Sequence, residues 1–165
     1  MSDLSVLTGL DDGSDQSTQL IKLISKDHVS YEIDRKSAYI SKLIKTSLQS
    51  DPTSTELELT TSSSVLSAII EYMRHHNGIE PSIVEKPLRS KQMIDVCRDA
   101  WDAQYIDKYA NDRQYLYDII SAANYLDINS LLHLACAKVA SLIKGMYNAT
   151  SNSISHNLHT LLPPT

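Results

Sequence analysis

The sequence predicts an α+β domain, with a small sheet near the start of the chain and helices from there to the end. Two strand-like apolar segments lie before residue 35, and the helical patterns that follow do not alternate regularly with strands. The chain has 165 residues, of which 42% are hydrophobic. This length and composition suffice for one sizeable core.

A β-hairpin opens the predicted fold. Residues 20–24 form an apolar run, residues 26–28 can turn, and apolar side chains then alternate at period two from Val29 to Ile33. This pattern is typical of two antiparallel strands joined by a short connection.

A helix and a third strand come next. Apolar residues recur at helical spacing over residues 40–48, and Asp34 or Ser37 can cap the start of this helix. Leu57 and Leu59 alternate with glutamates, which predicts a short, half-buried strand. The predicted order is therefore β-β-α-β.

The rest of the chain is predicted to be helical apart from a loop over residues 79–90. Each helix is predicted from apolar residues at helical spacing and, in most cases, from a capping residue. The predicted helices are residues 65–73 ending at Asn77-Gly78, a helical stretch within 93–106, residues 116–123 capped by Asn111 or Asp112, and residues 131–143 capped by Asn129 or Ser130 and ending at Gly145.

Both ends of the chain are predicted to be disordered. Residues 1–18 form an acidic leader without Lys or Arg, so they lack the basic start of a signal peptide. Residues 146–165 are rich in Ser, Asn, Thr and His and show no amphipathic pattern. No apolar run approaches the roughly 20 residues of a membrane helix, so no membrane partner is expected.

Charge and residue usage exclude several function classes. The net charge of -5 disfavours nucleic acid as a partner, and the four glycines are not clustered as a phosphate-binding loop requires. Cys97 and Cys136 lie far apart and indicate a reducing compartment. His75 and His76 are adjacent on a predicted helix, which is poor geometry for one metal. We expect no metal, no cofactor and no catalysis.

Several segments between residues 20 and 145 can be recognised together, and the most specific are AANYLDI at 122–128 and LIKG at 142–145. In their order along the chain these segments resemble the Skp family, the adaptor subunits of SCF ubiquitin ligases. The resemblance implies a BTB/POZ-like core over residues 19–110, followed by helices over 111–145 of the kind that contact cullin and F-box proteins.

The resemblance also implies two binding surfaces. By motif position, Asn124 and Tyr125 are expected to bind cullin. The alternative is that Tyr125 is a core aromatic and Asn124 a helix C-cap. The residues expected to bind the F-box are Tyr117, Leu132, Cys136, Val139 and Ile143.

The last four of these F-box residues form one helical stripe, which could instead be pure core. Ala137, Lys138 and Ser141 are expected on the opposite face. Because Leu131, Ala135 and Leu142 widen the apolar surface beyond one packing stripe, a second partner is expected.

The chain departs from the family after Gly145. The resemblance implies a turn and two further helices that embrace the F-box, and residues 146–165 cannot supply them, so weaker F-box binding is expected. Two explanations are open: a divergent adaptor that lost or replaced this clamp, or an alternative or mis-assigned coding end. The second is slightly favoured.

The sequence thus predicts a non-catalytic adaptor that joins a cullin to F-box substrate receptors, in the cytoplasm and nucleus. The alternative is a BTB-like module that has lost F-box binding and pairs with itself, as a homodimer when unpartnered.

Overall fold

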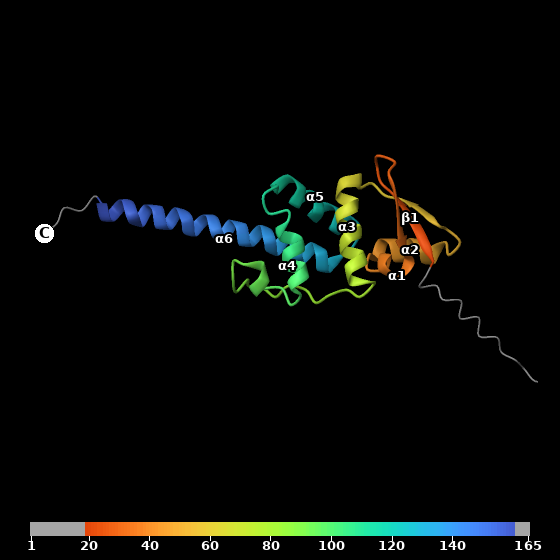
Figure 1. Cartoon of the computed structure of the whole chain (residues 1–165), viewed down its shortest axis with the longest axis horizontal. Helices are drawn as coiled ribbons and strands as arrows, with labels where there is room; N and C mark the ends of the chain where they lie inside the picture. Colours follow the sequence, from red (N-terminus) through yellow and green to blue (C-terminus); the bar gives the residue numbers. More distant parts are fainter. Residues whose placement is uncertain (1–18, 161–165) are drawn as a thin grey trace, which may run out of the picture.

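The computed structural model describes the backbone of residues 19–160 and the side chains of residues 19–145. Figure 1 shows a sheet at one end of the body, α3 beside it, α4 and α5 next, and α6 running out beyond them. The elements are β1 (Leu20–Ile24), β2 (Ser30–Asp34), α1 (Arg35–Ala38), α2 (Lys42–Ser50), β3 (Glu56–Glu58), α3 (Ser63–His76), the 3₁₀ helix η1 (Met93–Asp95), α4 (Ala100–Asp107), α5 (Arg113–Tyr125) and α6 (Asn129–Thr160).

The sheet has the order β2-β1-β3, with β1 in the middle. β1 pairs antiparallel with β2, where Ile21 faces Ile33, and parallel with β3, where Leu23 faces Leu57. Ile21, Leu23 and Ile33 are buried, so one face of the sheet joins the core. The α+β class, the hairpin and the third strand are confirmed.

The prediction of a single helix after the hairpin is wrong, because two caps divide this segment. The Asp34 carboxylate accepts a hydrogen bond from the Ser37 N–H at 2.8 Å and begins α1. The Ser41 hydroxyl accepts one from the Ile44 N–H at 3.2 Å and begins α2. Ser37 is therefore the donor to a cap and not the cap itself.

Helix α3 carries much of the core and ends where the sequence predicts. Leu66, Ile69 and Met73 are fully buried on it. Asn77 ends the helix with φ 48°, and Gly78 follows with φ 78°. A Cβ at Gly78 would lie 2.3 Å from the Lys36 carbonyl oxygen, so this turn requires glycine.

The helical stretch predicted within 93–106 is divided into η1 and α4. Asp99 separates them, because its carboxylate accepts a hydrogen bond from the Trp101 N–H at 2.9 Å and starts a new helix. The preceding residues 79–90 contain neither helix nor strand, as predicted.

The predicted end of the last helix at Gly145 is wrong, because α6 continues to Thr160. Gly145 has open space around it and is tolerated within the helix, and residues 146–160 contain neither Pro nor a second Gly to stop it. The predicted disordered tail from residue 146 does not fit this backbone. Residues 1–18 and 161–165, also predicted to be disordered, lie outside the described part.

Within the described residues, no helix combines the length and apolarity that crossing a membrane requires.

Candidate functional site

Helices α5 and α6 form the framework of the candidate site. They pack side by side, and α5 is capped by Asp112, whose carboxylate accepts the Tyr115 N–H at 2.9 Å. Leu116 and Ile119 of α5 and Leu131 and Ala135 of α6 are buried in the common core. Side chains on the other faces of these two helices are therefore held in fixed positions.

The inward face of α6 carries the residues that the sequence suggests are on its outer side. Ala137, Lys138 and Ser141 are all buried. The Lys138 ammonium lies 2.8 Å from an Asp107 carboxylate oxygen at the end of α4, and the Ser141 hydroxyl donates to the Lys138 carbonyl. An ion pair satisfies the buried charge, so this face turns toward α4 and leaves the apolar stripe outside.

The stripe and Tyr117 together form a partly exposed apolar surface, called here the α5/α6 face and defined by Tyr117, Leu132, Cys136, Val139 and Ile143. Tyr117 is 52% exposed and Ile143 is 49% exposed. Leu132 and Val139 are half-buried against the core. The pure-core alternative therefore accounts for part of the stripe but not for its outer edge.

A small hollow of about 90 Å³ lies in this face. It brings together Tyr117, Val139 and Ile143, whereas Leu132 and Cys136 lie outside its lining. The hollow is also lined by Leu142, which the sequence placed on the wider apolar surface of this helix, and by Arg113 and Leu116, which the sequence did not assign to the F-box surface. Arg113 precedes Tyr117 by four residues, about one helical turn, so helical spacing was the available signal for this residue.

The second surface lies at the C-terminal end of α5. Asn124 is exposed and Tyr125 is 37% exposed. Leu126 follows as the helix C-cap, with its N–H bonded to the Ala122 carbonyl at 2.9 Å. The alternative of a core aromatic preceded by a C-cap is therefore wrong.

Tyr125 borders a hollow of about 330 Å³, called here the Tyr125 hollow. The Asn124 side chain does not line it. Sequence reasoning did not find the remaining lining, because it combines residues of α5 with the start of α3 and the turn before it, which are distant in the sequence. The lining residues are Thr60, Thr61, Ser62, Val65, Asp118, Ser121, Ala122 and Tyr125.

The two surfaces share α5 but point in different directions. Tyr117 and Tyr125 are eight residues apart. At 1.5 Å and 100° per residue, they are separated by about 12 Å along the helix and about 80° around it. The two tyrosines therefore offer different faces of the same helix.

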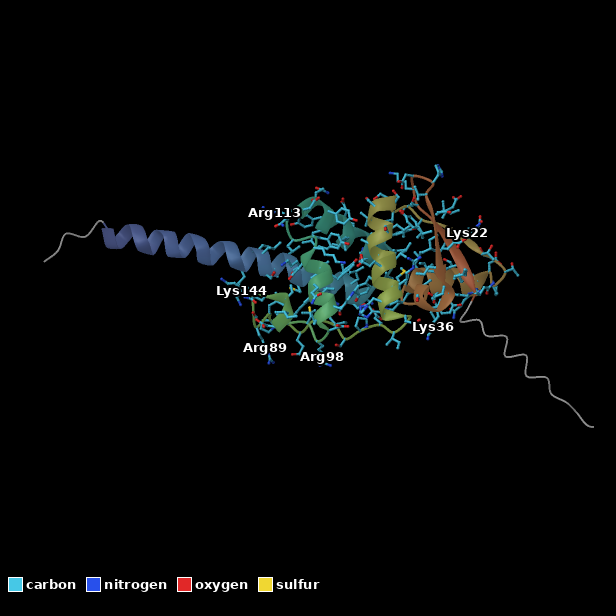
Figure 2. The ribbon with its side chains drawn as sticks, in the orientation of Figure 1. Lys22, Lys36, Arg89, Arg98, Arg113 and Lys144 are labelled. Atoms are coloured by element: carbon cyan, nitrogen blue, oxygen red, sulfur yellow. The ribbon has the colours of Figure 1, made fainter. Side chains whose placement is uncertain are left out.

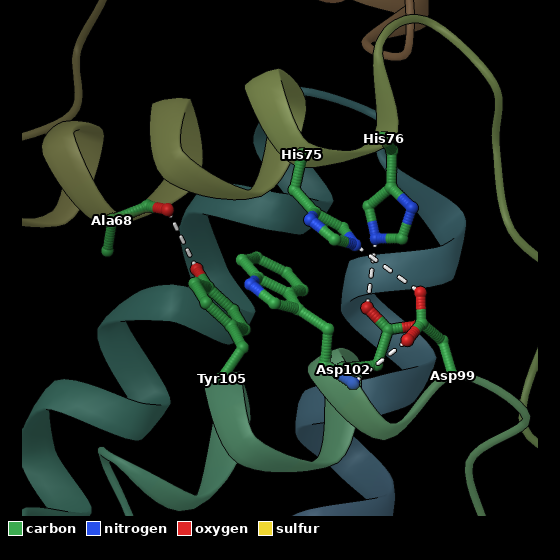
Figure 3. Close-up of polar contacts among 7 residues, drawn as sticks. Ala68, His75, His76, Asp99, Asp102 and Tyr105 are labelled. Carbon is green, nitrogen blue, oxygen red and sulfur yellow. Dashed lines mark hydrogen bonds and ion pairs between the residues drawn. The ribbon is translucent and has the colours of Figure 1, made fainter.

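A cluster of aromatic and charged side chains fixes α4 against α3 (Figure 3). The His76 Nε2 lies 2.9 Å from Asp102, and the His75 Nε2 lies 3.3 Å from Asp99. The His75 ring stacks on Trp101 at 3.7 Å between centroids. The Trp101 N–H and His75 both bond to the Asp99 carboxylate, which lowers its pKa. The adjacent histidines thus hold two helices together.

The same region offers no reactive thiol. Burial raises the pKa of Cys97 to about 11, and the nearby carboxylates of Asp102, Asp107 and Asp99 add to this effect. The thiol therefore stays protonated near neutral pH. Among the described residues, no three His, Cys, Asp or Glu side chains are placed to hold a metal.

Comparison with known proteins identifies the family. Residues 19–78 match the Skp1 family, tetramerisation domain. Over 131 residues the chain is 38% identical to the S-phase kinase-associated protein 1 homolog of Tetrahymena thermophila, covering 79% of this chain and 77% of that protein. The chain belongs to the Skp1 family. The Skp resemblance and the POZ-type fold are thereby confirmed.

Two further relatives are similar to the chain over most of its length, and the name of one of them states an assembly. The E3 ubiquitin ligase complex SCF subunit sconC of Arthroderma otae is 39% identical over 132 residues, covering 78% of this chain and 77% of the relative. The Suppressor of kinetochore protein 1 of Schizosaccharomyces pombe is 36% identical over 132 residues, covering 76% of this chain and 77% of the relative. The α5/α6 face and the Tyr125 surface remain predicted binding sites.

Proposed function

We propose that this Skp1-family chain is a non-catalytic adaptor subunit of an SCF-type E3 ubiquitin ligase, joining a cullin scaffold to F-box substrate receptors. Two relatives that match most of the chain are named S-phase kinase-associated protein 1 homolog and E3 ubiquitin ligase complex SCF subunit sconC. The observation that carries the proposal is the pair of partly exposed surfaces that α5 and α6 display in different directions. An adaptor needs two such surfaces.

The α5/α6 face is the proposed F-box surface. Tyr117 and Ile143 offer exposed apolar area at its edge, and the hollow between them can take an apolar side chain. Aromatic residues in such positions contribute strongly to protein interfaces. The ion pair between the buried Lys138 and the exposed Asp107 supports this role indirectly, because it keeps the opposite face of α6 against α4.

The cullin surface is proposed to centre on Asn124 and Tyr125. Tyr125 offers a rigid aromatic ring beside the Tyr125 hollow, and the exposed Asn124 amide can hydrogen-bond to a partner.

The proposed location of the protein is the cytoplasm and nucleus. The free thiols of Cys97 and Cys136 support it, because they suit a reducing compartment. The net charge of -5 supports a protein that does not bind nucleic acid.

The first experiment is a tagged pull-down of residues 1–165 from the source cells, with mass spectrometry of the co-purifying chains. Recovery of cullin together with F-box proteins supports the adaptor. Recovery of neither, with a homodimer in light scattering, favours the self-associating alternative.

Two variants separate the proposed surfaces. Asn124→Lys with Tyr125→Ala is expected to abolish cullin recovery while circular dichroism and Tm stay nearly unchanged, because both side chains are exposed. Val139→Asp is expected to abolish F-box recovery. Val139 is half-buried, so Ile143→Asp provides the same test where Val139→Asp unfolds. Retained binding by the folded variants would refute these assignments.

A further inference from the structure

A polar pocket lies apart from the residues that define the two proposed partner surfaces, and it has no role in the proposed adaptor function. It holds about 270 Å³ between the C-terminal part of α3, the starts of α4 and α6, and the segment 81–98. Drug-sized ligands use pockets of about 300–1,000 Å³, so this one fits a single long side chain.

The floor of this pocket carries an unsatisfied hydroxyl. Ser130 is 3% exposed, and its Oγ has no hydrogen-bond partner among the described residues. Its N–H donates to Glu80 at 3.1 Å, so only the hydroxyl is left. Burial raises the pKa of Tyr72, and the nearby Ser130 hydroxyl partly offsets this rise. The hydroxyls of Tyr72 and Ser130 nevertheless do not meet hydrogen-bond geometry with each other. A buried unsatisfied hydroxyl costs free energy that a polar ligand atom would recover.

The walls of the pocket favour a positive ligand. Four carboxylates line it, from Glu85, Asp95, Asp99 and Asp102. The lining cations, Arg89 and Arg98, both approach Glu85, at 3.7 and 3.6 Å. Figure 2 shows both arginines at the outer edge of the body, and their side chains are largely exposed, so these long ion pairs hold Glu85 weakly.

Apolar groups complete the pocket beside the carboxylates. Pro81, Val84, Val96 and Leu134 contribute to its lining. An arginine side chain matches this combination, because its alkyl stem packs on apolar groups while its guanidinium donates to several acceptors. Guanidinium is also less strongly hydrated than ammonium, which suits a partly enclosed site.

We propose that this pocket binds the arginine side chain of a partner peptide, with the guanidinium donating to the Ser130 hydroxyl and the neighbouring carboxylates. The raised pKa of Cys97, to which Asp102 and Asp99 contribute, is consistent with a negative potential in the pocket. This proposal is independent of the adaptor function, since neither the α5/α6 face nor the Tyr125 hollow contributes to it.

The test is an NMR titration of the full chain with the peptide acetyl-Gly-Arg-Gly-amide. We expect millimolar binding, with amide shift changes concentrated at Val96, Cys97, Ser130 and Leu134. The matched peptide contains citrulline, which has nearly the same shape without the charge, and is expected to bind at least about tenfold more weakly. Equal binding of the two peptides, or shift changes elsewhere, would overturn the proposal.

Two variants identify the groups involved. Ser130→Ala is expected to weaken binding of the arginine peptide about tenfold. Ser141→Ala is its control, because Ser141 is another buried α6 serine and does not line the pocket. Glu85→Gln, at an exposed position on the rim of the pocket, is expected to weaken binding of the arginine peptide about twofold. Because this side chain is exposed, the substitution leaves the packing of the core unchanged. Unchanged affinity in folded Ser130→Ala and in Glu85→Gln would refute the assignment.

Discussion

Replacing Tyr117 with alanine should weaken F-box binding by an amount that its exposure defines. An enclosed aromatic side chain buries about 150–250 Å². Because Tyr117 is 52% exposed, about 100 Å² of it remains for a partner to cover. At about 25 cal/mol per Å², this area contributes about 2.5 kcal/mol, or about 60-fold in Kd.

Ile143→Ala gives a second expected loss of F-box affinity, from another residue of the α5/α6 face. Truncation removes about three carbon groups, or about 2.4 kcal/mol for full burial at about 0.8 kcal/mol each. Ile143 is 49% exposed, so about half of this, about 1.2 kcal/mol, remains to be gained on binding. The expected loss is about sevenfold in Kd.

The assay is isothermal titration calorimetry with a purified F-box domain. Ile94→Ala is the matched control, because Ile94 is also 49% exposed but lies on η1, outside the α5/α6 face. We expect its Kd to equal that of the unmodified chain. Equal losses in Ile143→Ala and Ile94→Ala, or no loss in folded Tyr117→Ala, would show that the α5/α6 face does not bind the F-box.

Three further predictions concern the scaffold. Tyr105→Phe should lower the free energy of unfolding in urea by about 1 kcal/mol, since the buried hydroxyl donates to an α3 carbonyl at 2.8 Å (Figure 3); an unchanged value would contradict that bond. Hydrogen bonds from Ser63 lower the pKa of Asp27 from 3.8 to about 2, so this carboxylate stabilises the fold above pH 3.8 and ceases to do so as the pH falls toward 2. Ser63→Ala should return the pKa toward 3.8 in a carboxyl NMR titration, and a value that stays near 2 would exclude Ser63 as the cause. With Cys136 replaced by serine, Cys97 should react with a disulfide reagent at pH 8 about 100-fold more slowly than a thiol of pKa 9.0, and a comparable rate would exclude its raised pKa of about 11.

Local patterns in the sequence were sufficient to predict an element of the fold where a single signal dominates. The alternation around Val29 to Ile33 specified the hairpin, and Asn77-Gly78 specified the end of α3. The segment after the hairpin was harder, because Ser41 caps a new helix inside what reads as one helical pattern. A serine within a periodic segment does not reveal from sequence alone whether its hydroxyl caps or faces solvent.

The candidate site shows a different limit of prediction from sequence, because its surfaces depend on contacts between distant parts of the chain. The apolar stripe of α6 was visible from its spacing, but which side faces the core depends on α4, because Lys138 pairs with Asp107 there. A lysine at helical spacing normally indicates a solvent face. The Tyr125 hollow also depends on residues 60–62, which are distant in the chain and approach α5 only after folding.

The geometry of α5 explains how one small chain can serve two partners without a moving part. The Tyr117 and Tyr125 side chains differ by about 80° around one helix, so the helix itself sets the angle between the two proposed interfaces. Buried core residues pack α5 against α6, while the Lys138–Asp107 pair holds α6 against α4 and the His75 and His76 contacts hold α4 against α3. If the two surfaces bind as proposed, these polar contacts on α4 and α6 would help to set the relative position of the cullin and the F-box, and hence where a bound substrate would lie.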